Sequence, residues 1–157
     1  MLIFTEKRAI IVTLLKFRGN NRMDNKKCGA ALPSTAALSY LGDARHALYV
    51  RRMLVSRGIT KSAELNSEAL KYVTAEAQAR MYEKIADLLT EEERDVFRRA
   101  SNSTHLNKPR HASGRDYRYA TGFEAVVGML EWLGDGDRLE FLLQKSHIEE
   151  MENDTEN

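Results

Sequence analysis

Cysteine is nearly absent from this chain: Cys28 is the only one among 157 residues. A single cysteine excludes an intramolecular disulfide framework and is typical of a reducing compartment, so we expect a cytoplasmic protein. Long apolar runs are also missing, because none reaches the roughly 18 residues that a membrane-spanning helix needs. The sequence therefore predicts no membrane span.

The chain has almost no excess of charge of either sign, since its formal net charge is +1. Charge on the whole molecule thus gives no reason to expect nucleic-acid binding, and such an argument must rest on local clusters. The four histidines lack metal-ligand spacing and no cysteine pair exists, so no zinc site is expected. Neither a phosphate-binding glycine loop nor a serine nucleophile elbow is present.

Proline is rare, with two residues in the chain, and apolar residues recur at helical spacing over long stretches. No segment keeps the alternation of a half-buried strand, so we predict an all-α fold. A chain of this length is expected to form one domain with a sizeable core. The expected helices cover about residues 35–56, 62–73, 75–89, 91–100 and 117–133, with a last helix from Asp135 or Asp137 to about 148.

Capping signals support the starts of these helices. Ser34 or Thr35 is the expected N-cap of the helix over 35–56, and Thr74 that of the helix over 75–89. Thr90 and Glu93 have the spacing of a capping box. Residues 101–116 have no periodicity and are predicted to form a long loop.

The ends of the chain are expected to differ from its middle. We predict an N-terminal extension over residues 1–30, a folded domain over 31–148 and an acidic tail over 149–157. Charged residues break up the apolar run of the extension, which argues against a secretory signal, whereas an organellar transit peptide stays open. We hypothesise that translation begins at Met23, and an intact mass matching Met1 would contradict this.

Two carboxylates lie on helices that are otherwise apolar: Asp43 in the run 37–53 and Glu124 in the run 119–130. A carboxylate is costly to bury, and Mg²⁺ needs only one or two acidic groups when phosphate supplies other ligands. The pair therefore indicates a shared divalent-cation site. The alternative is that each acid is half-exposed or ion-paired. Gly42 and Gly128 would allow close helix approach in either case.

Basic residues gather between residues 98 and 118, where Asp116 is the only acid. A local positive excess in a nearly neutral protein predicts a phosphate-binding surface. The alternative is a solvated loop that its charge keeps soluble. The basic residues of this cluster are Arg98, Arg99, Lys108, Arg110, Arg115 and Arg118, with His105 and His111 beside them.

The motifs Tyr-Leu-Gly-Asp-Ala at 40–44 and Thr-Gly-Phe-Glu-Ala-Val-Val-Gly at 121–128 resemble those of the ribonuclease III catalytic domain. The similarity is greatest to the short bacterial branch called Mini-ribonuclease III, which segments 71–79 and 116–119 also resemble. It extends from about Leu32 to His147 in the order and spacing of the family.

This resemblance implies a dimeric, all-α endonuclease domain that cuts double-stranded RNA and leaves 5′-phosphate and 3′-hydroxyl ends. It implies that Asp43 and Glu124 are catalytic and bind Mg²⁺, for which Mn²⁺ could substitute. By analogy the substrate is a precursor of large-subunit ribosomal RNA, with a ribosomal protein as a further partner. No double-stranded-RNA-binding domain is expected after Ile148.

The family pattern also suggests residues that contact RNA. It is matched at Arg98, Arg99 and Asn102, whereas the sequence departs from it between Ser103 and Ser113. The further RNA-binding residues that we expect are Lys108, Arg110 and Arg115.

Several positions depart from the family. Larger ribonuclease III enzymes carry acids where this chain has Ser39 and Thr121, and Arg45-His46-Ala47 replaces the commoner Val-Tyr-Glu of the branch. These departures keep open a non-catalytic relative that serves as an RNA-binding or ribosome-associated module. A third hypothesis is a helical protein-interaction adaptor without RNA, against which the basic cluster speaks.

Overall fold

The computed structural model describes residues 31–103 and 114–153 of the chain, with side chains as far as His147. The predicted extension, and the predicted RNA contacts Lys108 and Arg110, lie outside these residues. Throughout the described part the regular structure is helical, which confirms the predicted all-α fold. None of the described helices is long and apolar enough to cross a membrane.

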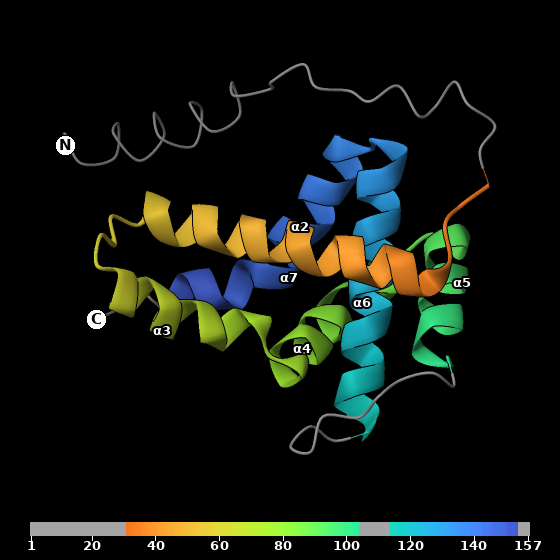
Figure 1. The fold of residues 1–157 in the computed structure, drawn as a ribbon, viewed down its shortest axis with the longest axis horizontal. Helices are drawn as coiled ribbons and strands as arrows, with labels where there is room; N and C mark the ends of the chain where they lie inside the picture. Colours follow the sequence, from red (N-terminus) through yellow and green to blue (C-terminus); the bar gives the residue numbers. More distant parts are fainter. Residues whose placement is uncertain (1–30, 104–113, 154–157) are drawn as a thin grey trace.

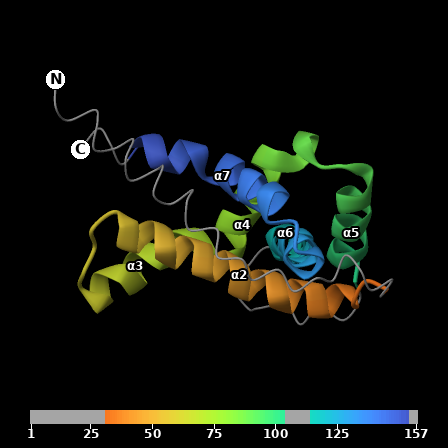
Figure 2. The ribbon, with the colours of Figure 1, turned by 90° about the horizontal axis from the view of Figure 1, so that it is seen from above.

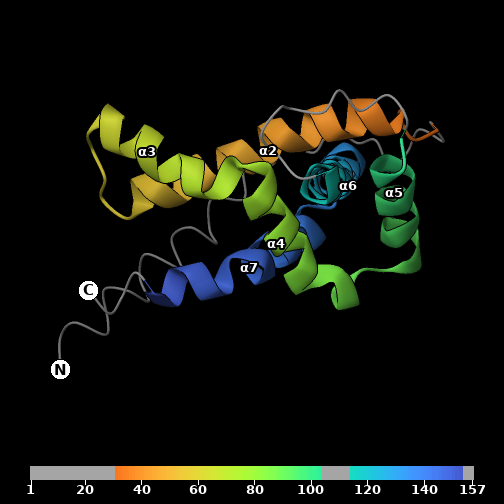
Figure 3. The same cartoon turned by 90° about the horizontal axis from the view of Figure 1, so that it is seen from below.

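Helix α6 (Gly114–Leu133) is the centre of the molecule. Figure 1 shows it crossing helix α2 (Thr35–Ser56), and Figure 2 shows it end-on with the other helices around it. Helices α4 (Ala75–Ile85) and α7 (Gly136–Asn153) pack on one side of α6, with α2 on the other (Figure 3). Helix α5 (Glu91–Ser101) packs against its remaining side.

Helix α3 (Ser62–Val73) follows α2 and packs along it (Figure 1). The apolar side of α2 is a row of residues four apart, in which Leu38, Val50 and Leu54 are buried against the other helices. Phe123 of α6 and Leu142 of α7 are among the side chains that complete this core. The central position of α6 explains why its segment 119–130 is apolar on nearly every face.

The capping predictions are confirmed. The Ser34 hydroxyl accepts a hydrogen bond from the Ala37 amide at 3.2 Å, and Thr74 caps α4 in the same way. In the capping box, the Thr90 hydroxyl accepts from the Glu93 amide, and the Glu93 carboxylate accepts from the Thr90 amide at 2.8 Å. These bonds satisfy amides that would otherwise lack partners at the helix starts.

Three predicted helix bounds were wrong. We predicted one helix over 75–89, but the α-helix ends at Ile85. The chain continues as a 3-10 turn, η2 (Ala86–Leu88). There the Arg138 side chain donates a hydrogen bond to the Leu88 carbonyl. Helix α6 begins at Gly114 rather than at residue 117, and the pair of Arg115 with Glu83 supports its first turn.

At the other end, α7 continues beyond Ile148 to Asn153 and so takes in part of the predicted acidic tail. No glycine or proline follows Ile148 within this helix, and glutamate and methionine are good helix formers. The chain therefore offers no signal that would stop the helix at residue 148.

Candidate active site

The site is built on a backbone contact between α2 and α6. A Cβ placed on Gly42 would lie 1.8 Å from the carbonyl oxygen of Glu124, and one on Gly128 would lie 1.9 Å from that of Leu38. Both distances are far inside van der Waals contact, so only glycine fits at either position. The backbone of Glu124 therefore lies against α2 immediately beside Asp43.

Ser39 and Thr121 add a polar link at the same crossing. The Ser39 hydroxyl donates a hydrogen bond to the main-chain carbonyl of Thr121 at 2.9 Å, and the Thr121 hydroxyl donates to the carbonyl of Tyr117 at 2.9 Å. These two residues occupy the positions where larger ribonuclease III enzymes carry acids. Here their hydroxyl protons bind main-chain oxygens, and the Ser39 bond holds the two helices together.

The two carboxylates meet at this crossing, on neighbouring helices. Asp43 is exposed, whereas Glu124 is half-buried. Burial and then the negative charge of Asp43 raise the pKa of Glu124 to about 7, while a hydrogen bond from Gln78 acts in the opposite direction. A shared cation would offset the repulsion that Asp43 exerts on the ionised form of Glu124.

This donor set fits a hard divalent cation. Carboxylate oxygens are the protein ligands that Mg²⁺ uses, and it usually takes only one or two and keeps several waters. Within the described ranges, no three residues among His, Cys, Asp and Glu come together in the manner of a metal-binding cluster. Asp43 and Glu124 are thus the residues that could hold such an ion, with its remaining positions open to water or phosphate.

Gln78 was not singled out from the sequence. It lies on α4 with 2% of its surface exposed, and its Nε2 lies 3.4 Å from Nδ1 of His46. A signal was available, because Gln78 is three and seven residues before Met81 and Ile85 and so belongs to the buried face of α4. A glutamine on that face requires polar partners, and the sequence alone did not indicate which they are.

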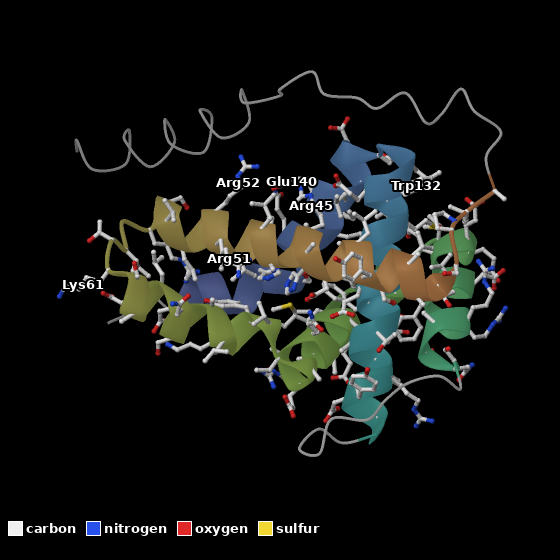
Figure 4. The ribbon with its side chains drawn as sticks, viewed as in Figure 1. Arg45, Arg51, Arg52, Lys61, Trp132 and Glu140 are labelled. Atoms are coloured by element: carbon white, nitrogen blue, oxygen red, sulfur yellow. The ribbon has the colours of Figure 1, made fainter. Side chains whose placement is uncertain are left out.

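Two of the residues that replace Val-Tyr-Glu have partners in this fold. Arg45 pairs with Glu131 of α6, with 3.0 Å between Nε and Oε2. His46 is fully buried, with its ring edge-on to Phe123 and its Nε2 3.4 Å from Nε2 of His147. Figure 4 shows Arg45 along the edge of α2. Arg45 and His46, which both depart from the family pattern, thus each contact a residue of another helix.

The predicted RNA-binding residues lie apart from the carboxylates. Arg98 and Arg99 are exposed in the last turn of α5, Asn102 is the C-cap residue of that helix, and Arg115 is exposed in the first turn of α6. Arg115 is nine residues before Glu124, which places it about 14 Å away along the helix axis. These four residues, which we call the basic end, cannot reach a phosphate held at Glu124. They could contact another part of an extended ligand.

The basic end is only partly free to bind. Arg98 pairs with Asp95 on its own helix. Arg115 contacts Glu83 at 2.6 Å and lies 4.8 Å above the ring of Tyr119. Exposed ion pairs of this kind are weak, so a phosphate could displace the carboxylate partner at small cost.

Comparison with known proteins agrees with the geometry. The family described as the ribonuclease III domain matches residues 36–136. The chain is 37% identical to Mini-ribonuclease 3 of Thermoanaerobacter sp. over 134 residues, which cover 85% of this chain and 94% of that protein. It is 41% identical to Mini-ribonuclease 3 of Streptococcus pneumoniae over 109 residues, covering 68% and 85%.

A solved structure has the same arrangement of helices. A crystal structure of a protein from Fusobacterium nucleatum superposes with a TM-score of 0.66 at 26% identity, and covers 77% of this chain and 93% of that one. The family match spans both α2 as far as Ser56 and α6, and so includes the crossing and its two carboxylates.

Proposed function

This chain belongs to the ribonuclease III family, in its Mini-ribonuclease III branch, and is an endoribonuclease; from that premise we propose that it cuts double-stranded RNA with Mg²⁺ held by Asp43 and Glu124. The observation that carries this proposal is the meeting of the two carboxylates at the glycine contact between α2 and α6. A binding protein has no evident need for two mutually repelling acids at that point.

Each carboxylate has a separate task. Asp43 is exposed, so it can reach a cation that also contacts an RNA phosphate, whereas half-buried Glu124 supplies a ligand of restricted mobility. When bound, Mg²⁺ supplies activation of a water and stabilisation of charge at the scissile phosphate, and Mn²⁺ could replace it. Hydrolysis joins the water oxygen to phosphorus and breaks the bond to the 3′-oxygen, which leaves a 5′-phosphate and a 3′-hydroxyl.

The RNA would be recognised by its shape. Side chains cannot read the deep, narrow major groove of A-form helices, so contacts to phosphates and 2′-hydroxyls should dominate. Support comes from the exposed positions of Arg98, Arg99, Asn102 and Arg115 at one end of the molecule. Lys108 and Arg110, between α5 and α6 in the sequence, are proposed as further contacts.

We propose that two copies form the active enzyme. The outer face of α2 leaves apolar side chains exposed: Tyr40 by 83%, Leu48 by 49% and Val55 by 59%. These residues are eight and seven apart, so they lie along one side of the helix. A second copy that covers this row would remove apolar surface from water and give the complex two active sites.

The biological setting follows from the branch alone. We propose a cytoplasmic enzyme that matures a precursor of large-subunit ribosomal RNA, with a ribosomal protein as an additional partner. Similarity to proteins called Mini-ribonuclease 3 supports this assignment.

The decisive experiment is cleavage of a generic RNA duplex by purified protein, with Mg²⁺ and with a chelator. The Glu124→Gln variant should be inactive, and Glu92→Gln, which changes an exposed acid on α5, is the matched control. Cleavage that needs Mg²⁺ and is lost only in Glu124→Gln supports the proposal. A duplex that is bound and never cut would favour the RNA-binding module instead.

A further inference from the structure

Helix α2 and the turn that follows it carry a second basic cluster, in addition to the one between residues 98 and 118. From Ala44 to Ala63 the sequence contains no aspartate or glutamate, whereas five basic residues occur there. In a nearly neutral protein, a segment with charge of one sign indicates a surface that attracts anions. The basic residues of this segment are Arg45, Arg51, Arg52, Arg57 and Lys61.

Two of these five residues already have partners within the fold. Arg45 pairs with Glu131 at 3.0 Å, and Nη1 of Arg57 donates a hydrogen bond to the hydroxyl of Tyr72 at 3.0 Å. The other three are exposed, and within residues 31–103 and 114–153 none of their side chains has a hydrogen-bond or ion-pair partner. The residues that are free to bind an external anion are therefore Arg51, Arg52 and Lys61.

Arg51 lies on the same side of α2 as Asp43. The two residues are eight apart, which is twice the four-residue spacing that keeps side chains on one face of a helix. Each also directly follows a buried residue of α2, Gly42 and Val50 respectively, so both lie beside the buried row of this helix. The spacing places Arg51 about 12 Å from Asp43 along the helix axis.

The residue between Asp43 and Arg51 at helical spacing is Ala47. An acid at this position would stand four residues before Arg51, the arrangement in which opposite charges on a helix pair best. The methyl group of Ala47 offers no such partner. Arg51 is thus free on the side of α2 that carries the proposed metal ligand.

A duplex held at Asp43 and Glu124 brings further phosphates to Arg51. Every nucleotide of both strands carries a negative charge, so other phosphates lie about 12 Å from the one at the carboxylates. A guanidinium binds a phosphate through two parallel N–H donors. Arg98 and Arg115 must exchange a carboxylate partner for that phosphate, whereas Arg51 has no such partner among the residues described.

Arg51 and the basic end lie in different directions from the carboxylates. Arg51 is in the C-terminal half of α2, and Arg115 of the basic end is in the first turn of α6. Figure 1 shows that these two helices cross, so their far ends point away from one another. Phosphate contacts in two directions fix how a duplex is turned over the active site, which contacts in one direction cannot do.

We propose that Arg51 is a further RNA-contacting residue, which binds a backbone phosphate of the duplex beyond the nucleotide held at Asp43 and Glu124. This inference rests on the proposed function, because it takes the duplex to be bound at those two carboxylates. Arg51 positions the duplex and takes no part in breaking the scissile bond.

The first test measures duplex binding without metal in Arg51→Ala, with Arg52→Ala as the matched control. Arg52 is the adjacent exposed arginine, and Figure 4 shows the two side chains on different sides of α2. Arg51→Ala should raise Kd a few-fold and lower the logarithmic salt slope by about one unit, as the loss of one phosphate contact does. Arg52→Ala should match the parent, and Arg51→Lys, which keeps the charge, should retain the slope.

Cleavage with Mg²⁺ gives an independent readout. The phosphate at Arg51 is remote from the reacting atoms, so KM should rise in Arg51→Ala while kcat stays at the parental value. A merely structural role of Arg51 would instead lower kcat or the yield of folded protein.

The second test locates the phosphate itself. Uncharged methylphosphonate linkages are placed one at a time along a generic RNA duplex, and binding is measured for the parent and both alanine variants. One linkage that weakens binding to the parent and to Arg52→Ala should have no effect on Arg51→Ala, because its charged partner is already missing.

Three outcomes would overturn the inference. These are an unchanged salt slope in Arg51→Ala, an equal loss in Arg51→Ala and Arg52→Ala, and the same pattern of sensitive linkages in Arg51→Ala and the parent. Each of them leaves the proposed function intact if the parent still cuts the duplex with Mg²⁺. A parent that neither binds nor cuts duplex RNA would overturn both.

Discussion

The proposed metal ligands Asp43 and Glu124 illustrate, at the scale of single residues, how a function can oppose stability. The negative charge of Asp43 is one of the causes that raise the pKa of Glu124, so the metal-free site carries an unfavourable interaction. Active sites commonly retain such costs because the same groups serve binding or chemistry. Removing one of the two charges should therefore help the fold and harm the function.

We predict that Asp43→Asn abolishes cleavage, by at least about 10³-fold, because several kcal/mol of transition-state stabilisation depends on the metal. Duplex binding should persist, and the metal-free variant should unfold at a slightly higher temperature than the parent. Asp87→Asn, at an exposed acid in η2, is the control. A variant that cuts at the parental rate would remove Asp43 from the mechanism.

His46 and His147 make the protein sensitive to acid. Their pKa values fall from 6.5 to about 3 and about 4 on folding, so the unfolded chain binds protons more readily. The stability that comes from keeping them neutral is complete above about pH 6.5 and is lost as the pH falls towards those folded values. At pH 5 the loss should be on the order of 2 kcal/mol for each histidine.

Urea unfolding at pH 7.5 and pH 5 tests this prediction. In His147→Asn the amide can still donate to the Leu143 carbonyl, but the residue no longer titrates. We expect that variant to be less stable than the parent at pH 7.5 and to lose roughly half as much stability on acidification. An equal loss in parent and variant would show that other groups cause the acid sensitivity.

At the scale of helices, the crossing of α2 and α6 depends on two glycines. We predict that Gly42→Ala destabilises the protein by at least about 3 kcal/mol, because the methyl group meets the backbone of Glu124, which cannot turn aside as a side chain can. Cleavage should fall as well, since separating the helices moves the carboxylates apart. Gly136→Ala is the matched control, because its methyl group would meet nothing within 4 Å. Urea unfolding and duplex cleavage together would show both effects.

Helix starts were predictable because their signals are local. The caps at Ser34, Thr74 and Thr90 depend on residues within one turn, and the structure has them as expected. The end of α4 was not predictable, since the 3-10 turn after Ile85 is accompanied by a bond from Arg138, 50 residues away from Leu88. Sequence reasoning thus succeeded where the cause lies near in the chain.

The same distinction applies to the site. Asp43 and Glu124 stood out because an acid on an apolar helix is a local anomaly, although their roles stay predictions. Gln78 is a similar anomaly on the buried face of α4, but its hydrogen-bond partner His46 lies on α2, 32 residues away in the sequence. Only the tertiary arrangement connects these two residues.

For the whole molecule, binding of duplex RNA should depend on the local basic cluster more than on the net charge. We predict that Arg115→Ala weakens duplex binding a few-fold and lowers the salt dependence of binding by up to about one unit of its logarithmic slope. Arg80→Ala, at an exposed arginine on α4, is the comparison. If the slope is the same in both variants and the parent, Arg115 is not part of the RNA surface.

Assembly is the second property of the whole molecule. We predict that Leu48→Glu shifts sedimentation from dimer to monomer, because a charge in the apolar row of α2 would be buried without a partner. Leu70→Glu, at a leucine on α3 that is 62% exposed, should leave assembly unchanged. A monomeric parent protein would remove the dimer from the proposed function.

The contact between Gly42 and Gly128 also bears on how far this sequence can diverge. The separation of the two helix axes there is set by one backbone lying against another, and not by the sizes of core side chains. Distant positions of the core could therefore be exchanged over generations while the two carboxylates kept their spacing. The crossing therefore keeps the spacing of the proposed catalytic carboxylates constant while substitutions accumulate in the rest of the core.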